Sequence, residues 1–123
     1  MQSNPVCWFE IYVQDMARAK SFYEGVLGRV LSRLEGPDFE MWAFDMSETA
    51  PGSGGALIHL PGVPSGCGGT LVYFACEDCA VEEARVVAHG GQIHRSKISI
   101  GPYGFISLAV DPEGNMIGLH SLK

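Results

Sequence analysis

Hydrophobic and polar positions follow a strand-then-helix plan at the start of the chain. Residues 8–13 are mostly aromatic or β-branched, and Glu10 is their only charge, which is typical of a strand with one packed face. Asp15 is placed to cap a helix, because its carboxylate can accept from the free amides of a first turn. Gly28 is expected to end that helix in the left-handed conformation. The apolar residues at helical spacing between them are Ala19, Phe22, Tyr23, Val26 and Leu27.

The second half of the chain repeats this plan. Asp78 and Gly91 lie 63 positions after Asp15 and Gly28, and a constant offset indicates a duplicated structural unit. Three shorter apolar runs follow each expected helix, at residues 29–34, 39–46 and 55–60, and again at 92–98, 105–110 and 116–122. The sequence therefore predicts an α+β protein of two βαβββ modules. Their expected bounds are about 5–61 and 69–123, with a linker over about 62–68.

Composition narrows the class of protein. With 123 residues and 46% hydrophobic content, the chain is expected to form a single domain over 1–123. A net charge of −6 with eight thinly spread basic residues excludes a basic patch for phosphate backbones, so no nucleic-acid partner is expected. No apolar run is long enough to cross a bilayer and no leader segment is recognisable, so we expect a cytoplasmic protein that does not bind membranes.

The cysteines do not form a recognisable metal or redox motif. Cys76 and Cys79 form one CxxC at the start of the second helix, but Glu77 and Asp78 between them oppose a thiolate. A second CxxC, which would complete a zinc site, is missing. We expect a reduced, partly buried pair of thiols in a reducing compartment.

Several segments carry a resemblance to a known family. WFEIYVQDMARAKSFYEGVLG, GGALI, GGQI and GPYGFISLAVDPEGNMIGLHS, within the doubled plan, resemble the vicinal oxygen chelate superfamily of glyoxalase I, bleomycin-resistance proteins and extradiol dioxygenases. The branch that is most similar is described as lactoylglutathione-lyase-related. The resemblance implies that the two modules form a curved mixed sheet around a cup-shaped site for a small molecule, and that the protein is a homodimer.

Metal enzymes of this superfamily place His or Glu ligands on the first and fourth strands of each module. By this resemblance the ligand positions fall on Trp8, Leu71 and Gly118, whose side chains cannot bind a divalent cation, and His59 alone offers a ligand. Because a catalytic metal usually needs about three protein ligands, the resemblance predicts that the usual metal site is lost and that no cofactor is bound.

A different set of residues is expected on the same surface. Strand alternation places Trp8 and Tyr12 on one face with Glu10, and the resemblance turns this face into the cup. The same parity is expected to bring Leu57 and His59 to this surface. The candidate site comprises Glu10 as the catalytic residue, Trp8, Tyr12, Trp42, Tyr73 and Tyr103 as ligand-binding residues, and His59 and His120 as ligands if a metal is bound.

Three functions remain open. The first is a metal-independent protein that binds a small organic molecule in an aromatic, acidic groove. The second is a glyoxalase-like lyase or isomerase, or a dioxygenase, with one zinc, nickel, manganese or iron ion displaced onto Glu10, His59 and His120. The third is a metal-free enzyme with Glu10 or a histidine as base. Structural roles compete with these: the tryptophans can fill a core, His120 can be peripheral, and Tyr103 can shape a loop.

Overall fold

The computed structural model describes residues 4–36 and 38–123, and these form two compact units. Residues 8–70 make up one unit, the first module. Residues 71–123 make up the other, the second module, together with residues 4–7. That the two modules form a single domain joined by a linker over 62–68 stays a prediction.

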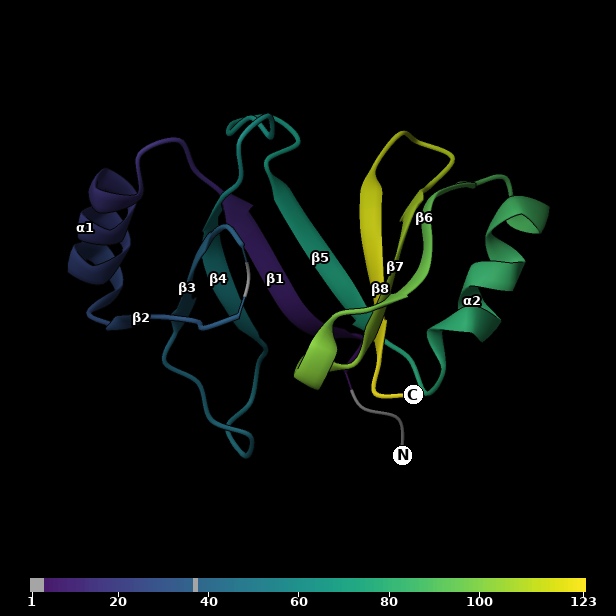
Figure 1. Ribbon diagram of the computed structural model, residues 1–123, viewed down its shortest axis with the longest axis horizontal. Helices are drawn as coiled ribbons and strands as arrows, with labels where there is room; N and C mark the ends of the chain where they lie inside the picture. The colour runs from purple at the N-terminus through teal and green to yellow at the C-terminus, as the bar shows by residue number, and fades with distance from the viewer. Residues whose placement is uncertain (1–3, 37) are drawn as a thin grey trace. The chain divides into compact units, whose positions relative to one another are not determined.

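The first module has the predicted βαβββ order (Figure 1). Its elements are β1 (Val6–Tyr12), α1 (Met16–Leu27), β2 (Leu31–Arg33), β3 (Glu40–Phe44) and β4 (Gly54–His59). The strand order is β2-β3-β4-β1, with β1 parallel to β4 and the other neighbours antiparallel.

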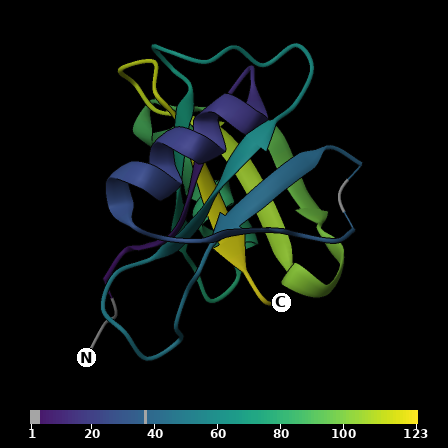
Figure 2. The same ribbon diagram turned by 90° about the vertical axis from the view of Figure 1, so that its left-hand side faces the viewer.

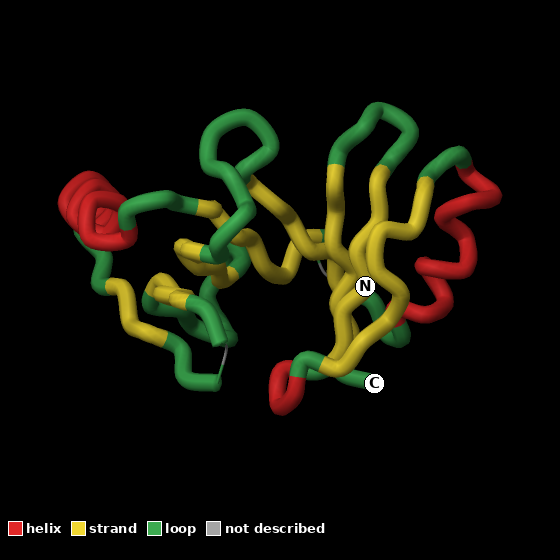
Figure 3. Tube along the Cα trace, turned by 45° about the horizontal axis from the view of Figure 1, so that its top comes forward, coloured by secondary structure: helices red, strands yellow, loops and turns green. Residues whose placement is uncertain are grey.

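The second module repeats the same order and adds the short helical turns η1 and η2. Its elements are β5 (Thr70–Ala75), α2 (Cys79–Val86), η1 (Val87–His89), β6 (Gln92–Ser99), η2 (Gly101–Tyr103), β7 (Phe105–Val110) and β8 (Met116–Ser121). The strand order is β5-β8-β7-β6, with β5 parallel to β8. Figure 3 shows η2 as a short red turn near the C-terminus. The α+β class and the tandem βαβββ modules are therefore confirmed.

Both helix starts and the end of α1 lie where the capping residues predicted them. Asp15 accepts a hydrogen bond from the Arg18 amide at 3.0 Å, and Gly28 ends α1 with a φ of 65°. Asp78 caps α2 by accepting from the Ala80 amide at 3.0 Å. The second helix ends at Val86, before the glycines expected to stop it, because the chain tightens into η1 and then turns at Gly90.

The two faces of the first module's sheet are packed differently. Helix α1 lies across one face (Figure 2), and the buried residues there are Val13, Met16, Leu31, Phe44 and Leu57. The opposite face carries a second buried cluster of Ala43, Ala56 and Ile58. Of the predicted apolar stripe on α1, Ala19 and Tyr23 pack against the core, whereas Phe22, Val26 and Leu27 are 52 to 64% exposed. The apolar stripe of α1 is therefore wider than the part of the helix that packs against the sheet.

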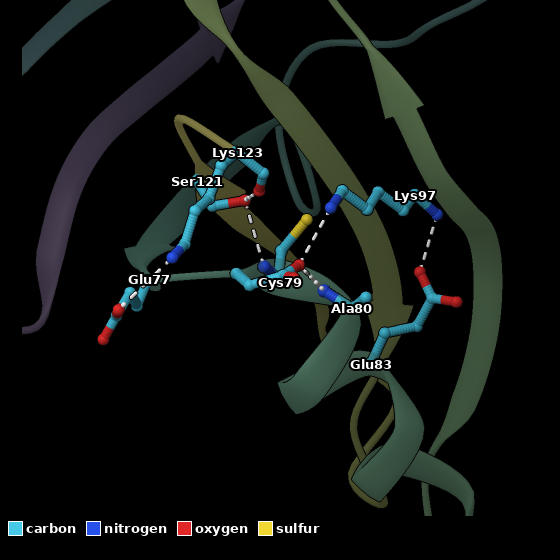
Figure 4. A network of polar contacts seen from close by, with 8 residues as sticks. Glu77, Cys79, Ala80, Glu83, Lys97, Ser121 and Lys123 are labelled. Atoms are coloured by element: carbon cyan, nitrogen blue, oxygen red, sulfur yellow. Dashed lines mark hydrogen bonds and ion pairs between the residues drawn. The ribbon is translucent and has the colours of Figure 1, made fainter.

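Polar contacts attach α2 to the sheet of the second module (Figure 4). The hydroxyl of Ser121 accepts from the Cys79 amide at 3.0 Å, and the Asp78 carboxylate accepts from the Lys97 ammonium at 2.8 Å. The hydrogen bond from Lys97 lowers the pKa of Asp78, and the same contact raises the pKa of Lys97. The main-chain amide of Lys97 also donates to Glu83 at 2.6 Å, so these residues fix the helix on β6.

No helix in the described part of the chain is long and apolar enough to cross a membrane.

Candidate functional site

A carboxylate held by two aromatic side chains lies on strand β1. The indole nitrogen of Trp8 donates to Oε2 of Glu10 at 3.2 Å, and the hydroxyl of Tyr12 donates to Oε1 at 2.8 Å. Successive side chains of a strand point to opposite faces, so residues two apart share a face and can make these contacts within one strand. We call these three residues the Glu10 clamp.

The carboxylate of the Glu10 clamp is buried, and the two aromatic side chains that hold it are half-buried. Glu10 is only 7% exposed. A carboxylate is rarely buried to this extent unless hydrogen-bond donors hold it, as Trp8 and Tyr12 do here. Burial, and then the negative charge of Glu10, raise the pKa of Tyr12 far above its ordinary value. Tyr12 therefore stays protonated at neutral pH and continues to donate its hydrogen bond.

The Glu10 clamp lies on the sheet face that α1 does not cover. In the parallel pairing of β1 with β4, Glu10 lies opposite Ala56 and Tyr12 opposite Ile58. Ala56 and Ile58 belong to the buried cluster against which Trp8 and Tyr12 pack. On this face the oriented carboxylate of β1 therefore lies beside a buried apolar cluster.

The predicted parity of strand β4 is wrong. Leu57 is part of the buried cluster under α1, and His59, two residues further, shares that face. The sequence pattern assigned Leu57 and His59 to the face of Glu10, but the register places Ala56 and Ile58 there. The structure does not bring His59 to the same face as Glu10.

Trp42 also lies on the α1 side of the sheet. It packs against the cluster under α1, and the Lys20 ammonium sits 3.5 Å from the centre of its ring. Its indole nitrogen donates to Glu40 at 3.1 Å. Sequence reasoning missed Glu40, although the spacing of Glu40 and Trp42 along a strand is the same as that of Trp8 and Glu10.

The candidate residues of the second module lie on β5, β8 and η2. Tyr73 is buried and lies opposite Gly118 in the β5–β8 pairing, and a β-carbon at Gly118 would overlap the ring of Tyr73. His120 lies opposite Ala75, and its Nε2 is 2.6 Å from the main-chain oxygen of Tyr103. The side chain of Tyr103 is exposed.

The positions that the resemblance assigns to metal ligands do not fit a divalent ion. The Trp8 ring lies against Gly54, where an added β-carbon would be 3.3 Å from it, and its nitrogen is committed to Glu10. Leu71 is buried and apolar, and the ring of Tyr73 covers Gly118. Over residues 4–36 and 38–123, no group of three or more His, Cys, Asp or Glu side chains could hold a metal ion.

The cysteines of the CxxC are free thiols, as predicted. Cys79 is buried and Cys76 is half-buried. Burial, followed by the charge of Glu82, raises the pKa of Cys76 to about 11. Cys76 is therefore a neutral thiol at physiological pH and is a poor nucleophile.

Comparison with known proteins supports the resemblance. Residues 6–119 match the sequence profile of the Glyoxalase/Bleomycin resistance protein/Dioxygenase superfamily. The curated proteins named "Putative glyoxylase CFP32" from Mycobacterium bovis and Mycobacterium tuberculosis are 27% identical over 113 residues, which is 92% of this chain. The chain spans 42% of the length of these relatives.

Solved structures share the fold. The hypothetical protein BH1468 from Bacillus halodurans superposes with a TM-score of 0.74 at 14% identity, covering 99% of this chain and 96% of that one. Methylmalonyl-CoA epimerase from Mycobacterium tuberculosis superposes with a TM-score of 0.72 at 16% identity, covering 100% of this chain and 93% of that one. Since the profile match extends over both modules, the chain belongs to the Glyoxalase/Bleomycin resistance protein/Dioxygenase superfamily.

Proposed function

We propose that this chain is a metal-independent member of its superfamily that binds a small organic molecule through the Glu10 clamp. The observation that carries the proposal is a buried carboxylate whose two oxygens are oriented by Trp8 and Tyr12. A fixed carboxylate can accept from a donor on a ligand without losing side-chain entropy, and an indole offers an apolar floor. Small-molecule sites combine such apolar walls with a few oriented polar groups.

The ligand that suits this surface is neutral or cationic. Glu10 attracts a positive charge or a hydrogen-bond donor, and the net charge of −6 acts in the same direction at longer range. Methylmalonyl-CoA, the substrate in the name of one protein with this fold, carries several negative charges on its coenzyme A part. The net charge of this chain opposes association with such a polyanion.

The remaining candidate residues keep separate roles in this proposal. Tyr73 on β5 and Tyr103 on η2 belong to the second module and are assigned no contact with a ligand of the Glu10 clamp. His59 and His120 are not metal ligands in it, because His59 lies on the other face of its sheet and His120 is close to the Tyr103 main chain. The four free cysteines favour a cytoplasmic protein, and the homodimer implied by the resemblance stays a prediction for analytical ultracentrifugation.

Metal content and ligand binding test this proposal together. Protein purified without an affinity tag is soaked in zinc, nickel, manganese or iron(II) and analysed by elemental mass spectrometry. We expect far less than the roughly one equivalent that a catalytic centre would hold. A single metal near one equivalent that is lost in Glu10→Ala would overturn the proposal in favour of a displaced metal centre.

Ligand binding is tested with small aromatic amines and neutral aromatic compounds, and a change in the intrinsic fluorescence of the protein reports binding. A ligand of the Glu10 clamp should bind at least about tenfold more weakly to Glu10→Gln, which loses the charge but keeps the shape. Glu48→Gln, an exposed change in a loop, is the matched control. If hits bind Glu10→Gln as tightly as the parent protein, the site lies elsewhere. A hit that is chemically converted, with conversion but not affinity lost in Glu10→Gln, would make Glu10 a base.

A further inference from the structure

A hollow lies in the first module, where β3 begins and β4 ends. Its volume is about 510 Å³, which is large enough for a small molecule, and it is open to solvent rather than enclosed. We call it the Arg33 hollow, and its lining residues are Arg33, Asp38, Phe39, Glu40, His59, Leu60 and Pro61.

The Arg33 hollow is separate from the Glu10 clamp. Arg33 lies opposite Trp42 in the β2–β3 pairing, and Glu40 lies opposite His59 in the β3–β4 pairing. Trp42 packs on the α1 side, so alternation places Arg33, Glu40 and His59 on that side as well. The Glu10 clamp occupies the other face of the same sheet. Phe39 and Leu60 of the hollow also pack against the buried cluster on that face, so the charged groups, and not the whole lining, separate the two sites.

Positively and negatively charged side chains line the hollow, and they form no ion pair with one another among the described residues. The ion pairs of the described residues join Arg29 to Asp45, Lys97 to Asp78 and Lys123 to Glu77, and none involves a group of the hollow. Arg33, Asp38 and Glu40 therefore keep their charges available to a ligand. Phe39, Leu60 and Pro61 add an apolar wall beside them.

One of the two carboxylates is already oriented. The indole nitrogen of Trp42 donates to Glu40 at 3.1 Å, and Lys20 lies over the ring of the same tryptophan at 3.5 Å. The ring is thus held from two directions, and it fixes one oxygen of Glu40. Preorganisation of this kind lowers the entropy that a ligand must overcome on binding.

We propose that the Arg33 hollow binds a small zwitterion of the α-amino acid class with an apolar side chain. Its carboxylate pairs with the Arg33 guanidinium, which offers two parallel donors, and its ammonium pairs with Glu40. A simple anion would meet the charges of Asp38 and Glu40, and a simple cation would meet Arg33. Only a ligand that carries both charges satisfies both sides of the hollow, while its side chain contacts Phe39 and Pro61.

The two tryptophans of the chain provide a spectroscopic test. In ¹⁵N-labelled protein each indole N–H gives one signal, and Trp42→Phe and Trp8→Phe assign them. L-Leucine should shift the Trp42 signal saturably and leave the Trp8 signal in place. N-acetyl-L-leucine, which lacks the ammonium, and isopentylamine, which lacks the carboxylate, should each bind at least about tenfold more weakly, as expected when one charged contact is lost.

Substitutions in the hollow complete the test. Arg33→Gln and Glu40→Gln should each weaken leucine binding at least about tenfold. Arg29→Gln, which removes an exposed arginine paired with Asp45 outside the hollow, should bind leucine normally. The remaining amide spectrum shows whether each variant keeps its fold.

Three results would overturn this proposal. One is the absence of a saturable Trp42 shift with any standard amino acid at concentrations up to about 10 mM. A dissociation constant above that concentration would be weaker than two charged contacts should give. Another is equal binding of leucine and either single-charge analogue. The third is a leucine shift that Arg33→Gln and Glu40→Gln leave unchanged. None of these results bears on the Glu10 clamp, because that site is reported by Trp8.

Discussion

The first module contains two similar tryptophan–glutamate pairs on opposite faces of one sheet. Trp8 donates to Glu10 at 3.2 Å, and Trp42 donates to Glu40 at 3.1 Å. In both pairs the residues are two apart on one strand. The pairs differ in what surrounds them.

Glu10 has a second donor in Tyr12 and is almost fully buried. Glu40 is half-buried at the edge of a hollow, and its tryptophan is covered by Lys20. The same local pattern therefore gives an enclosed carboxylate on one face and a half-exposed one on the other. Local spacing therefore makes the hydrogen bond, whereas packing sets how buried it is and how much it contributes to stability.

Removal of each carboxylate tests this comparison most strongly. Glu10→Ala leaves the partly buried Trp8 N–H and Tyr12 O–H without this acceptor, and we expect it to lower the free energy of unfolding by about 2–4 kcal/mol. Glu40→Ala should cost about 1 kcal/mol or less, because water can reach the indole that it leaves. Urea unfolding followed by circular dichroism measures both losses. Equal losses would show that the two faces do not differ as described.

The hydroxyl of Tyr12 is the feature that the second pair lacks. Tyr12→Phe removes one donor to a buried carboxylate, and we expect a loss of about 1–2 kcal/mol in the free energy of unfolding. Tyr23→Phe is the matched control, since Tyr23 contacts the core through its ring against Phe44. Losses of the same size in the two variants would mean that the Tyr12 hydrogen bond contributes nothing specific.

The ionisation of Tyr12 gives a pH dependence. Folding raises its pKa, chiefly by burial and then by the charge of Glu10, so the folded state holds the proton more tightly than the unfolded chain. The resulting stability is complete below the unfolded pKa of about 10 and decreases as the pH rises above it. In an ultraviolet titration of tyrosinate, Tyr12 should give a late ionisation step, and this step should be missing from Tyr12→Phe. A late step that persists in this variant would assign it to another tyrosine.

The cover over Trp42 is expected to contribute least. Lys20→Met keeps the length of the side chain but removes the ammonium above the ring, and should cost about 0.5 kcal/mol, as for a partly exposed cation–π contact. Arg18→Gln, an exposed change on the same helix, is the control and should be close to neutral. The fluorescence of Trp42, isolated in a Trp8→Phe background, should also change with Lys20→Met. An unchanged spectrum would mean that Lys20 does not lie over the indole in solution.

Much of the local structure could be predicted because its causes are local. Asp15 and Asp78 cap helices that begin at the next residue, and Gly28 ends α1 in the left-handed region. The contacts of Glu10 with Trp8 and Tyr12 follow from alternation along a single strand. None of these features depends on residues far away in the sequence.

The prediction failed where distant segments meet. Leu57 and His59 were assigned to the wrong face because the parity of β4 is set by its pairing with β1, about 46 residues earlier, and not by its own composition. Trp42 was grouped with Trp8 by residue type, although β3 turns it toward α1. Glu40 and Arg33 drew no attention, because charges near strand ends are common and only the pairing of three strands brings them to one hollow.

The two βαβββ modules, the starts of both helices and the shared face of the Glu10 clamp follow from consecutive residues, because short-range hydrogen bonds and the periodicities of strands and helices are local. The face that each strand presents depends instead on tertiary packing. This packing buried Glu10, placed Tyr73 over Gly118 and opened the Arg33 hollow. A shift of one residue in strand register exchanges the two faces of a sheet, and that register is fixed only when the whole core packs.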